Sequence, residues 1–494
     1  MKLQNILGIS AGFHDAAASV INTKGEILFA GHSERYSKKK NDADIHPGLL
    51  CELGQYSIHH VAYYERPWNK QLRQLYSGQG IEWSKLTVNQ ILGQQLQGYF
   101  EQATISSHNH HLSHAAGGFQ TSTFDRATVV VIDAVGEWDT VSIWGAEYCN
   151  GQARYRQLWR QQYPHSIGLF YTAMTDRIGL RPMEDEYVLM GMSAYGTSRV
   201  TKPLAKLVID NLEQLKFQQN FHAGVDENFL ASTENEDIAT ATQQVAETLI
   251  YSIMRRARSF AWSTNLVYSG GVALNCLANR NLGEYFEKIW IMPCPGDSGS
   301  SLGAAALVHG GRLQFDHAYL GHDIGGPYPV DAVLRSLLDD RICGVASGKA
   351  EFGPRALGNR SLLADPRGTD IKDQVNAIKR RQRFRPFAPV ILEEHVDQYF
   401  IMPNNWVDSR YMQIVGHCRR PDLYPAVTHI DGTSRIQTVP KDGSGIRSLL
   451  EAWYTATGCP MLLNTSLNIR GEPMVNDRRD ADRFEEQYNV RVWS

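Results

Sequence analysis

The segment 108–114, which reads His-Asn-His-His-Leu-Ser-His, has the residue types and the spacing of a metal site. If this segment is helical, His110 and His114 lie at positions i and i+4 on one face, where two imidazoles can bind the same ion. Asp133 and Asp297 each follow a strand-like run and are the candidates to complete a mixed nitrogen and oxygen set, which suits Fe(II), Mn, Zn or Mg. Two histidines at this spacing are, by themselves, more typical of a solvated surface helix, so that alternative stays open.

A second concentration of chemically active side chains lies in residues 348–386, where ten Lys and Arg stand against four Asp and Glu. Glycine and proline interrupt this stretch, which predicts turns that can direct guanidinium groups at phosphate or carboxylate oxygens. Arg435 and the amide and hydroxyl groups of 464–468 add neutral hydrogen bonds that can orient such an anion. A nucleic-acid patch is the alternative; we favour a small anion because few aromatic side chains are available to stack on bases.

The elements that position these residues are strands with polar turns at their ends. Residues 6–10 and 18–21 predict two strands joined by a turn that holds His14 and Asp15, and a third strand follows at 26–30.

The same pattern returns at 128–133 and 141–148, around Gly136, so the sequence predicts a duplicated architecture. Polar strand ends of an α/β sheet are where ligands bind, and two hairpin-tipped halves with a Gly-Gly turn are typical of actin and sugar-kinase ATPases. Ordinary tight turns in a large α/β protein explain the pattern equally well. Farther on we expect a helix over roughly 238–262, strands over 265–268 and 288–292, and an Ala-rich helix from Leu302.

Length and composition limit the class of protein. A chain of 494 residues exceeds the roughly 250–300 residues of a single core, so two or three domains are expected. A net charge of −3 argues against wholesale binding to nucleic acid or to an anionic membrane. Seven cysteines without a Cys-x-x-Cys pair, and no apolar run of membrane-spanning length, predict a cytoplasmic protein that does not bind membranes.

Motifs over nearly the whole chain resemble the O-carbamoyltransferases of nodulation-factor, cephamycin, novobiocin and tobramycin biosynthesis. The most specific is Glu-Phe-Gly-Pro-Arg-Ala-Leu-Gly-Asn-Arg-Ser at 351–361. The segments that carry the resemblance are 8–15, 33–36, 110–116, 133–138, 187–196, 269–275, 351–361, 384–389 and 463–473.

The resemblance implies two domains. Residues 1–320 would form a duplicated actin-like ATPase (ribonuclease-H-like) domain, with halves of about 1–125 and 126–320, like the metalloenzyme of tRNA threonylcarbamoyladenosine synthesis. Residues 321–494 would form a YrdC-like α/β domain. There, carbamoyl phosphate and ATP would give carbamoyl-adenylate, and the first domain would transfer the carbamoyl group to an acceptor hydroxyl at its metal.

The resemblance also implies a role for individual residues. His110, His114, Asp133 and Asp297 would bind the metal, with Fe(II) as first choice, and His14 would be the catalytic base. Nucleotide or carbamoyl-adenylate would contact Asp133, Ala134, Val135, Gly270, Gly271 and Asn275. Carbamoyl phosphate and ATP would contact Arg355, Lys379, Arg385, Arg435, Asn464 and Ser466. Acceptor contacts would come from Glu34, Lys40, Gly168 and Glu186.

The acceptor is the least determined partner. A small-molecule alcohol, such as a sugar or an antibiotic precursor, is our first expectation. A hydroxymethylated nucleobase in a nucleotide or in DNA is the first alternative, and a non-catalytic or kinase-like nucleotide-binding protein of the actin fold is the second. The oligomeric state is open, with a homodimer among the options.

Overall fold

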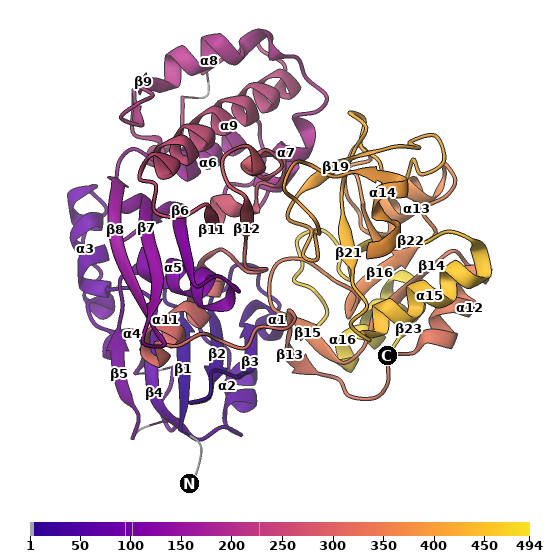
Figure 1. The fold of residues 1–494 in the computed structure, drawn as a ribbon, viewed down its shortest axis with the longest axis horizontal. Helices are drawn as coiled ribbons and strands as arrows, with labels where there is room; N and C mark the ends of the chain where they lie inside the picture. Colours follow the sequence, from indigo (N-terminus) through magenta and orange to yellow (C-terminus); the bar gives the residue numbers. More distant parts are fainter. Residues whose placement is uncertain (1–3, 94, 101, 227) are drawn as a thin grey trace. The chain divides into compact units, whose positions relative to one another are not determined.

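The computed structural model describes residues 4–93, 95–100, 102–226 and 228–494 (Figure 1). The chain divides into two compact units. The first consists of Met1–Ser33 and Asp42–Asp316, and the second of Glu34–Asn41 and His317–Ser494.

The segment Glu34–Asn41 corrects our expected domain composition, which assigned all of 1–320 to the first domain. Its short helix α1 (Glu34–Ser37) belongs to the second unit. The guanidinium of Arg35 donates to the carbonyl of Gly353 at 3.1 Å, and the ammonium of Lys38 pairs with Asp480. These contacts link residues that are more than 300 positions apart in the sequence, so hydropathy and spacing along the chain do not reveal them.

The first unit contains two five-stranded sheets with the same topology. In the sheet β3-β2-β1-β4-β5, β1 pairs antiparallel with β2 and parallel with β4. In the sheet β12-β11-β6-β7-β8, β6 pairs antiparallel with β7 and parallel with β11. In each sheet the outer pairs, β2 with β3 and β7 with β8, are antiparallel, and β4 with β5 and β11 with β12 are parallel. This repeated order confirms the duplicated, ribonuclease-H-like architecture of the actin class.

The predicted strands and helices of this unit are confirmed to within about three residues at each end. The first sheet has β1 (Asn5–Ser10), β2 (Ala17–Ile21), β3 (Ile27–His32), β4 (Ile58–Tyr63) and β5 (Thr104–Ser107). The second has β6 (Arg126–Gly136), β7 (Asp139–Cys149), β8 (Gln152–Gln162), β11 (Asn265–Ser269) and β12 (Lys288–Trp290). The helices are α2 (Pro47–Leu53), α3 (Pro67–Tyr76), α4 (Val88–Leu92), α5 (His110–Thr121), α6 (Ile167–Arg177), α7 (Glu186–Met192), α8 (Thr201–Val208), α9 (Asn235–Ser259), α10 (Cys276–Asn279) and α11 (Ser300–His309), with a small pair β9 (Ile209–Asn211) and β10 (Lys216–Phe217).

Helices α5 and α11 pack backbone to backbone. A Cβ added to Gly303 of α11 would lie 1.9 Å from the carbonyl oxygen of Ser113 in α5, and one added to Gly8 of β1 would lie 1.8 Å from the carbonyl oxygen of Ser301. Glycine is therefore required at both positions. This close approach brings the start of α5 next to the start of α11.

The second unit is a six-stranded mixed sheet in the order β21-β17-β22-β16-β14-β23 with helices on both faces. Alternate residues of β16 face two different cores: Leu363 packs with Trp453 of α15, whereas Leu362 packs with Phe484 of α16. The elements are β14 (Ile342–Ala346), β16 (Arg360–Ala364), β17 (Ala388–Leu392), β21 (Gln437–Val439), β22 (Met461–Ser466), β23 (Val492–Trp493), α12 (Val330–Asp339), α13 (Ile371–Ile378), α14 (Val396–Tyr399), α15 (Gly445–Thr457) and α16 (Arg478–Tyr488), with smaller sheets of β13 (Tyr319–Asp323) with β15 (Lys349–Glu351), and of β18 (Phe400–Ile401), β19 (Val415–Cys418) and β20 (Thr433–Arg435). Its likeness to YrdC stays a prediction.

The segment 351–361, hereafter the motif loop, is held by internal hydrogen bonds. Glu351 Oε1 accepts from the backbone N–H groups of Leu357, Asn359 and Arg360 at 2.8, 2.9 and 3.2 Å. The fully buried Arg360 uses all five guanidinium N–H groups on backbone carbonyls, at 2.9–3.1 Å. Arg360 is thus structural, and the loop leaves Arg355 partly exposed.

None of the helices in the described part of the chain has both the length and the apolar character needed to cross a membrane.

We predict that Arg360→Met lowers the free energy of unfolding of the second unit by about 3 kcal/mol or more, because five buried or partly buried carbonyls lose their donors. Arg335, which is exposed on α12, gives the matched control Arg335→Met. Thermal and denaturant unfolding measure both variants. Equal unfolding midpoints for the two would contradict the structural role of Arg360.

Candidate active site

The two histidines of the predicted metal site lie inside the first unit. The side chain of Asn109 caps α5 by accepting from the N–H of Leu112 at 3.0 Å, so the helix begins at His110. His110 is 1% and His114 is 3% exposed. The solvated surface helix is therefore wrong, and the i, i+4 pair points into the protein.

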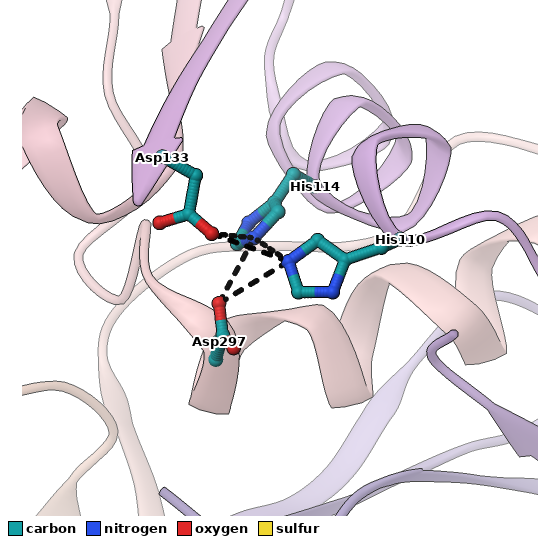
Figure 2. A group of neighbouring side chains, drawn as sticks. All are labelled: His110, His114, Asp133 and Asp297. Carbon is teal, nitrogen blue, oxygen red and sulfur yellow. Dashed lines mark hydrogen bonds and ion pairs between the residues drawn. The ribbon is translucent and has the colours of Figure 1, made fainter. Parts of the chain in front are cut away.

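Asp133 and Asp297 complete a buried group of four side chains, hereafter the His/Asp cluster (Figure 2). Asp133 lies on β6, and Asp297 begins the short turn before α11. The Nε2 atoms of His110 and His114 are 3.1 Å apart, and Asp297 Oδ1 lies 3.4 and 3.2 Å from them. Asp133 Oδ2 lies 3.3 Å from His110 Nε2.

This donor set suits a divalent cation. One ligand atom from each residue lies within 4.8 Å of the other three. Four ligands that each lie about 2.0–2.2 Å from one ion must be about 3–4 Å apart, and nitrogen with carboxylate oxygen fits a borderline or hard metal. The His/Asp cluster could therefore hold a metal ion.

The electrostatics of the His/Asp cluster keep its carboxylates ionised. Burial and the charge of Asp297 oppose ionisation of Asp133, but the hydrogen bond from His110 and the charges of His114 and His110 together outweigh them and lower the pKa of Asp133 to about 2. Burial likewise opposes ionisation of Asp297, and the neighbouring His110 and His114 hold its pKa well below the ordinary value. Two ionised carboxylates are the form that binds a cation.

A second layer of charged residues holds His110, and we did not identify it from the sequence. Glu65, which is fully buried, accepts from His110 Nδ1 at 3.3 Å and from the ammonium of Lys70 at 3.1 Å. Glu137 Oε1 accepts from the backbone N–H of His110 at 3.1 Å. A carboxylate on Nδ1 fixes the tautomer that leaves Nε2 free for a metal. For Glu65, the one signal in the sequence is its position two residues after the end of β4.

His14 lies beside the His/Asp cluster at the tip of the first hairpin. Its Nδ1 is 3.1 Å from Asp15 Oδ2, and its Nε2 is 3.5 Å from Asp297 Oδ2. Burial favours the neutral ring, but these two carboxylates outweigh it and raise the pKa of His14 to about 9.

Two of the nucleotide residues named from the sequence, Gly270 and Gly271, lie beside the strand that carries Asp133. The N–H of Gly271 donates to Asp133 Oδ1 at 3.1 Å, and Gly270 has a φ of +91° beside the backbone of Ile132. Asn275 does not contact the cluster through its side-chain amide, which pairs with that of Gln243 at 3.0 Å.

Gly168 and Glu186 make contacts that stabilise the fold. A Cβ on Gly168 would lie 2.7 Å from the Cα of Ala134, so this glycine lets α6 approach β6. Glu186 accepts from the hydroxyl of Thr172 at 2.9 Å.

The hydrogen bonds of the second unit link several of its predicted ligands. Asn464 Nδ2 donates at 3.1 Å to the carbonyl of Ala356, which follows Arg355, and at 2.7 Å to Gln437, which lies two residues after Arg435. The buried Lys379 donates to Ser466 Oγ at 3.2 Å.

The charge on Lys379 is disfavoured. Burial, followed by the charges of Arg381, Arg385 and Lys40, lowers the pKa of Lys379 well below its ordinary value. Lys40 therefore lies within electrostatic range of the predicted anion ligands. Glu34 accepts from the N–H of Asn41 at 3.1 Å within the same unit, whereas Gly168 and Glu186 belong to the first.

A polar cavity of about 360 Å³ adjoins the cluster, since Glu137 lies in its wall. The other lining residues are Arg66, Asn69, Asn109, Trp138, Asp139, Arg160 and Gln162.

Two family models match the chain in succession. The carbamoyltransferase N-terminus model matches residues 74–306, and the carbamoyltransferase C-terminus model matches residues 334–493. The chain belongs to the carbamoyltransferase family. As a member of this family it is a transferase. The alternative of a non-catalytic or kinase-like nucleotide-binding protein is therefore wrong.

Curated relatives cover most of the chain. An uncharacterised protein of Synechocystis sp. is 33% identical over 97% of this chain and 94% of its own length. Nodulation protein NolNO of Sinorhizobium fredii is 29% identical over 97% of this chain and 78% of its own. The 3'-hydroxymethylcephem-O-carbamoyltransferase of Streptomyces clavuligerus is 30% identical over 65% of this chain and 66% of its own.

Solved structures are more distant. The activator of 2-hydroxyisocaproyl-CoA dehydratase from Clostridium difficile has a TM-score of 0.35 at 14% identity, and covers 62% of this chain and 94% of its own. Full-length HypF has a TM-score of 0.36 at 12% identity, and covers 62% of this chain and 56% of its own. The fold assignment therefore depends on the strand order described above.

We predict that His114→Ala loses most of the bound metal without unfolding the protein, because the side chain contributes one of four ligands. Metal content after loading with Fe(II), Mn(II) or Zn(II), measured by plasma mass spectrometry, checks this. His59→Ala, at an exposed position, is the control. Unchanged metal content in His114→Ala would refute the assignment.

Glu65→Gln is expected to weaken metal binding about ten- to a hundredfold, since the amide keeps the shape but removes the charge that orients His110. Calorimetric titration of the metal-free protein with Mn(II) measures this. Glu82→Gln, at an exposed position of the same unit, is the matched control. Equal affinities in the two variants would limit Glu65 to a packing role.

Proposed function

We propose that the protein is an ATP-dependent O-carbamoyltransferase that forms carbamoyl-adenylate and transfers its carbamoyl group to an acceptor hydroxyl. The observation that carries this proposal is the buried His/Asp cluster in a chain matched by both carbamoyltransferase models. The cephem O-carbamoyltransferase among the relatives supports a hydroxyl as the acceptor.

The second unit would bind the anionic reactants. Water would release phosphate from carbamoyl phosphate there, and the carbamate formed would attack the α-phosphorus of ATP, which gives carbamoyl-adenylate and releases pyrophosphate. Arg355, Arg385 and Arg435 would bind phosphate oxygens, since guanidinium groups match that geometry and remain charged when partly buried. Lys379 would act at the same place, next to Ser466, with Asn464 as a neutral partner. The YrdC-like character of the unit is part of this proposal.

The first unit would hold the adenylate and the acceptor. A divalent metal at the His/Asp cluster, Fe(II) by preference and Mn, Zn or Mg otherwise, would supply Lewis-acid polarisation. The backbone of Asp133, Ala134 and Val135, with Gly270, Gly271 and Asn275, would enclose the nucleotide.

His14 would take the proton from the acceptor hydroxyl. Its Nε2 reaches the edge of the His/Asp cluster, 3.5 Å from Asp297. A base must be neutral, and a cation bound by Asp297 offsets the carboxylate charge that raises the pKa of His14.

The acceptor would be a small-molecule alcohol, such as a sugar or a natural-product precursor. Glu34, Lys40, Gly168 and Glu186 remain proposed contacts, although the first two belong to the second unit. The seven cysteines are all free, which supports a reducing, cytoplasmic location.

Incubation with ATP, carbamoyl phosphate and a panel of alcohols and nucleosides tests the function. We expect a mass gain of about 43 Da on the acceptor, the difference between a carbamoyl group and hydrogen. If carbamoylated products form only on hydroxymethylated nucleobases, the acceptor is a nucleotide or DNA and not another small-molecule alcohol. An absence of pyrophosphate release that depends on carbamoyl phosphate would overturn the proposal.

The two half-reactions should separate by mutation. Arg355→Ala should abolish pyrophosphate release, because the anion loses a bidentate partner in the pocket. His14→Ala should leave pyrophosphate release intact and slow carbamoyl transfer by about 10²–10⁴-fold. Pyrophosphate release in Arg355→Ala at the wild-type rate would refute the assignment of the pocket.

A further inference from the structure

Two side-chain amides, those of Asn464 on β22 and Gln437 on β21, form a buried pair in the second unit. Asn464 is 1% and Gln437 is 2% exposed. Gln437 Nε2 donates to the carbonyl of Leu357 at 2.9 Å, and Gln437 Oε1 accepts from Asn464 Nδ2 at 2.7 Å. The second N–H of Asn464 Nδ2 points at the carbonyl of Ala356, at 3.1 Å.

The chemistry of these partners fixes which way both amides face. Backbone carbonyls only accept hydrogen bonds, so the NH₂ group of Gln437 must face Leu357 and that of Asn464 must face Ala356. Gln437 then presents oxygen to Asn464. Both N–H groups of Asn464 are used, and its Oδ1 is a buried acceptor with no hydrogen-bond partner among the described residues.

This acceptor lies on the same face of the sheet as the predicted phosphate end of the pocket. Asn464 and Ser466 are two residues apart on β22, a rise of about 6.6–6.8 Å, with their side chains on one face. Ser466 Oγ accepts a hydrogen bond from Lys379 Nζ at 3.2 Å. Ser361, directly opposite Ser466 in the register, adds a buried hydroxyl whose oxygen also has no partner among the described residues.

We propose that Asn464 Oδ1 accepts a hydrogen bond from the amino group of carbamoyl phosphate, and that Gln437 is the positioning residue that keeps this oxygen turned toward the substrate. The inference rests on the proposed function, since it assumes that the second unit binds carbamoyl phosphate. It explains how the site would distinguish a carbamoyl group from another acyl group, and it assigns a role to Gln437.

The selectivity follows from the difference between two acyl phosphates. Acetyl phosphate has the phosphate and the carbonyl of carbamoyl phosphate, with a methyl group in place of the amino group. Basic residues attract both anions equally. A buried acceptor discriminates, because the methyl group leaves it without a hydrogen bond, which costs about ten- to a hundredfold in affinity.

Calorimetric titration of the full chain with carbamoyl phosphate, acetyl phosphate and inorganic phosphate tests the inference. We expect the wild-type protein to bind carbamoyl phosphate at least tenfold more tightly than acetyl phosphate. Asn464→Leu should bring this ratio close to one, mainly by weakening carbamoyl phosphate. Gln437→Met should lower the ratio at least threefold with little change in the affinity for phosphate.

Two further variants separate positioning from general stability. Gln437→Glu keeps the volume of the side chain and an oxygen for Asn464 Nδ2, but it sets a second oxygen against the carbonyl of Leu357, where both groups only accept hydrogen bonds. We therefore expect it to lower the ratio as Gln437→Met does. Gln374→Met, at an exposed position of α13, should behave as wild type.

The outcomes distinguish the two levels of the hypothesis. Equal affinities for the two acyl phosphates in the wild-type protein, or an unchanged ratio in both Asn464→Leu and Gln437→Met, would overturn the inference and leave the proposed pocket in place. Failure of the wild-type protein to bind any of the three anions would overturn the pocket, and the inference with it.

Discussion

The first unit depends on the pairing of two buried carboxylates, Asp133 and Asp297, with positive charge. Each is 7% exposed, and an ionised carboxylate removed from water is stable only when it is paired. The fold provides the pairing through the close contact of α5 with α11, where Gly303 approaches the backbone of Ser113. Because no side chain separates these helices, their starts meet, and His114 lies within 3.2 Å of Asp297.

Alternating charge continues outward from this centre. Glu65 joins His110 to Lys70, and the ammonium of Lys70 lies 3.2 Å from the ring centroid of Phe13, the residue before His14. The contacts that orient His110 therefore extend to Phe13, which is the neighbour of the proposed base His14. An alteration of Glu65 acts on both ends of this series, because the charge of Lys70 is then left buried without its carboxylate partner.

Sequence reasoning identified the residues that carry a motif and missed those that act only through tertiary contacts. Helical spacing places His110 and His114 on one face, and Asp133 follows an apolar, β-branched run, so the sequence alone points to all three. The contact of Glu65 with His110 spans 45 positions, so spacing along the chain does not connect these two residues. The short segment Glu34–Asn41 was assigned to the wrong unit for the same reason.

The number of basic residues in 348–386 overstates how many of them are available to bind an anion. Among the basic residues of 348–386, Arg360 is used entirely on backbone carbonyls, and Arg367 pairs with Asp365 at 2.9 Å. Composition cannot distinguish a guanidinium that supports a loop from one that faces a ligand, because both raise the count equally. The distinction lies in burial and in the number of donors already satisfied.

The two units use charge in opposite ways, and neither use is selective by itself. The carboxylates of the His/Asp cluster would attract any divalent cation, and the guanidinium groups proposed to bind anions in the second unit would attract any small phosphate. Selectivity must come from neutral groups with a fixed direction, since a hydrogen bond depends on orientation and a point charge does not. The amide pair of Gln437 and Asn464 has that property: backbone carbonyls determine its orientation, so the surrounding charge cannot reverse it.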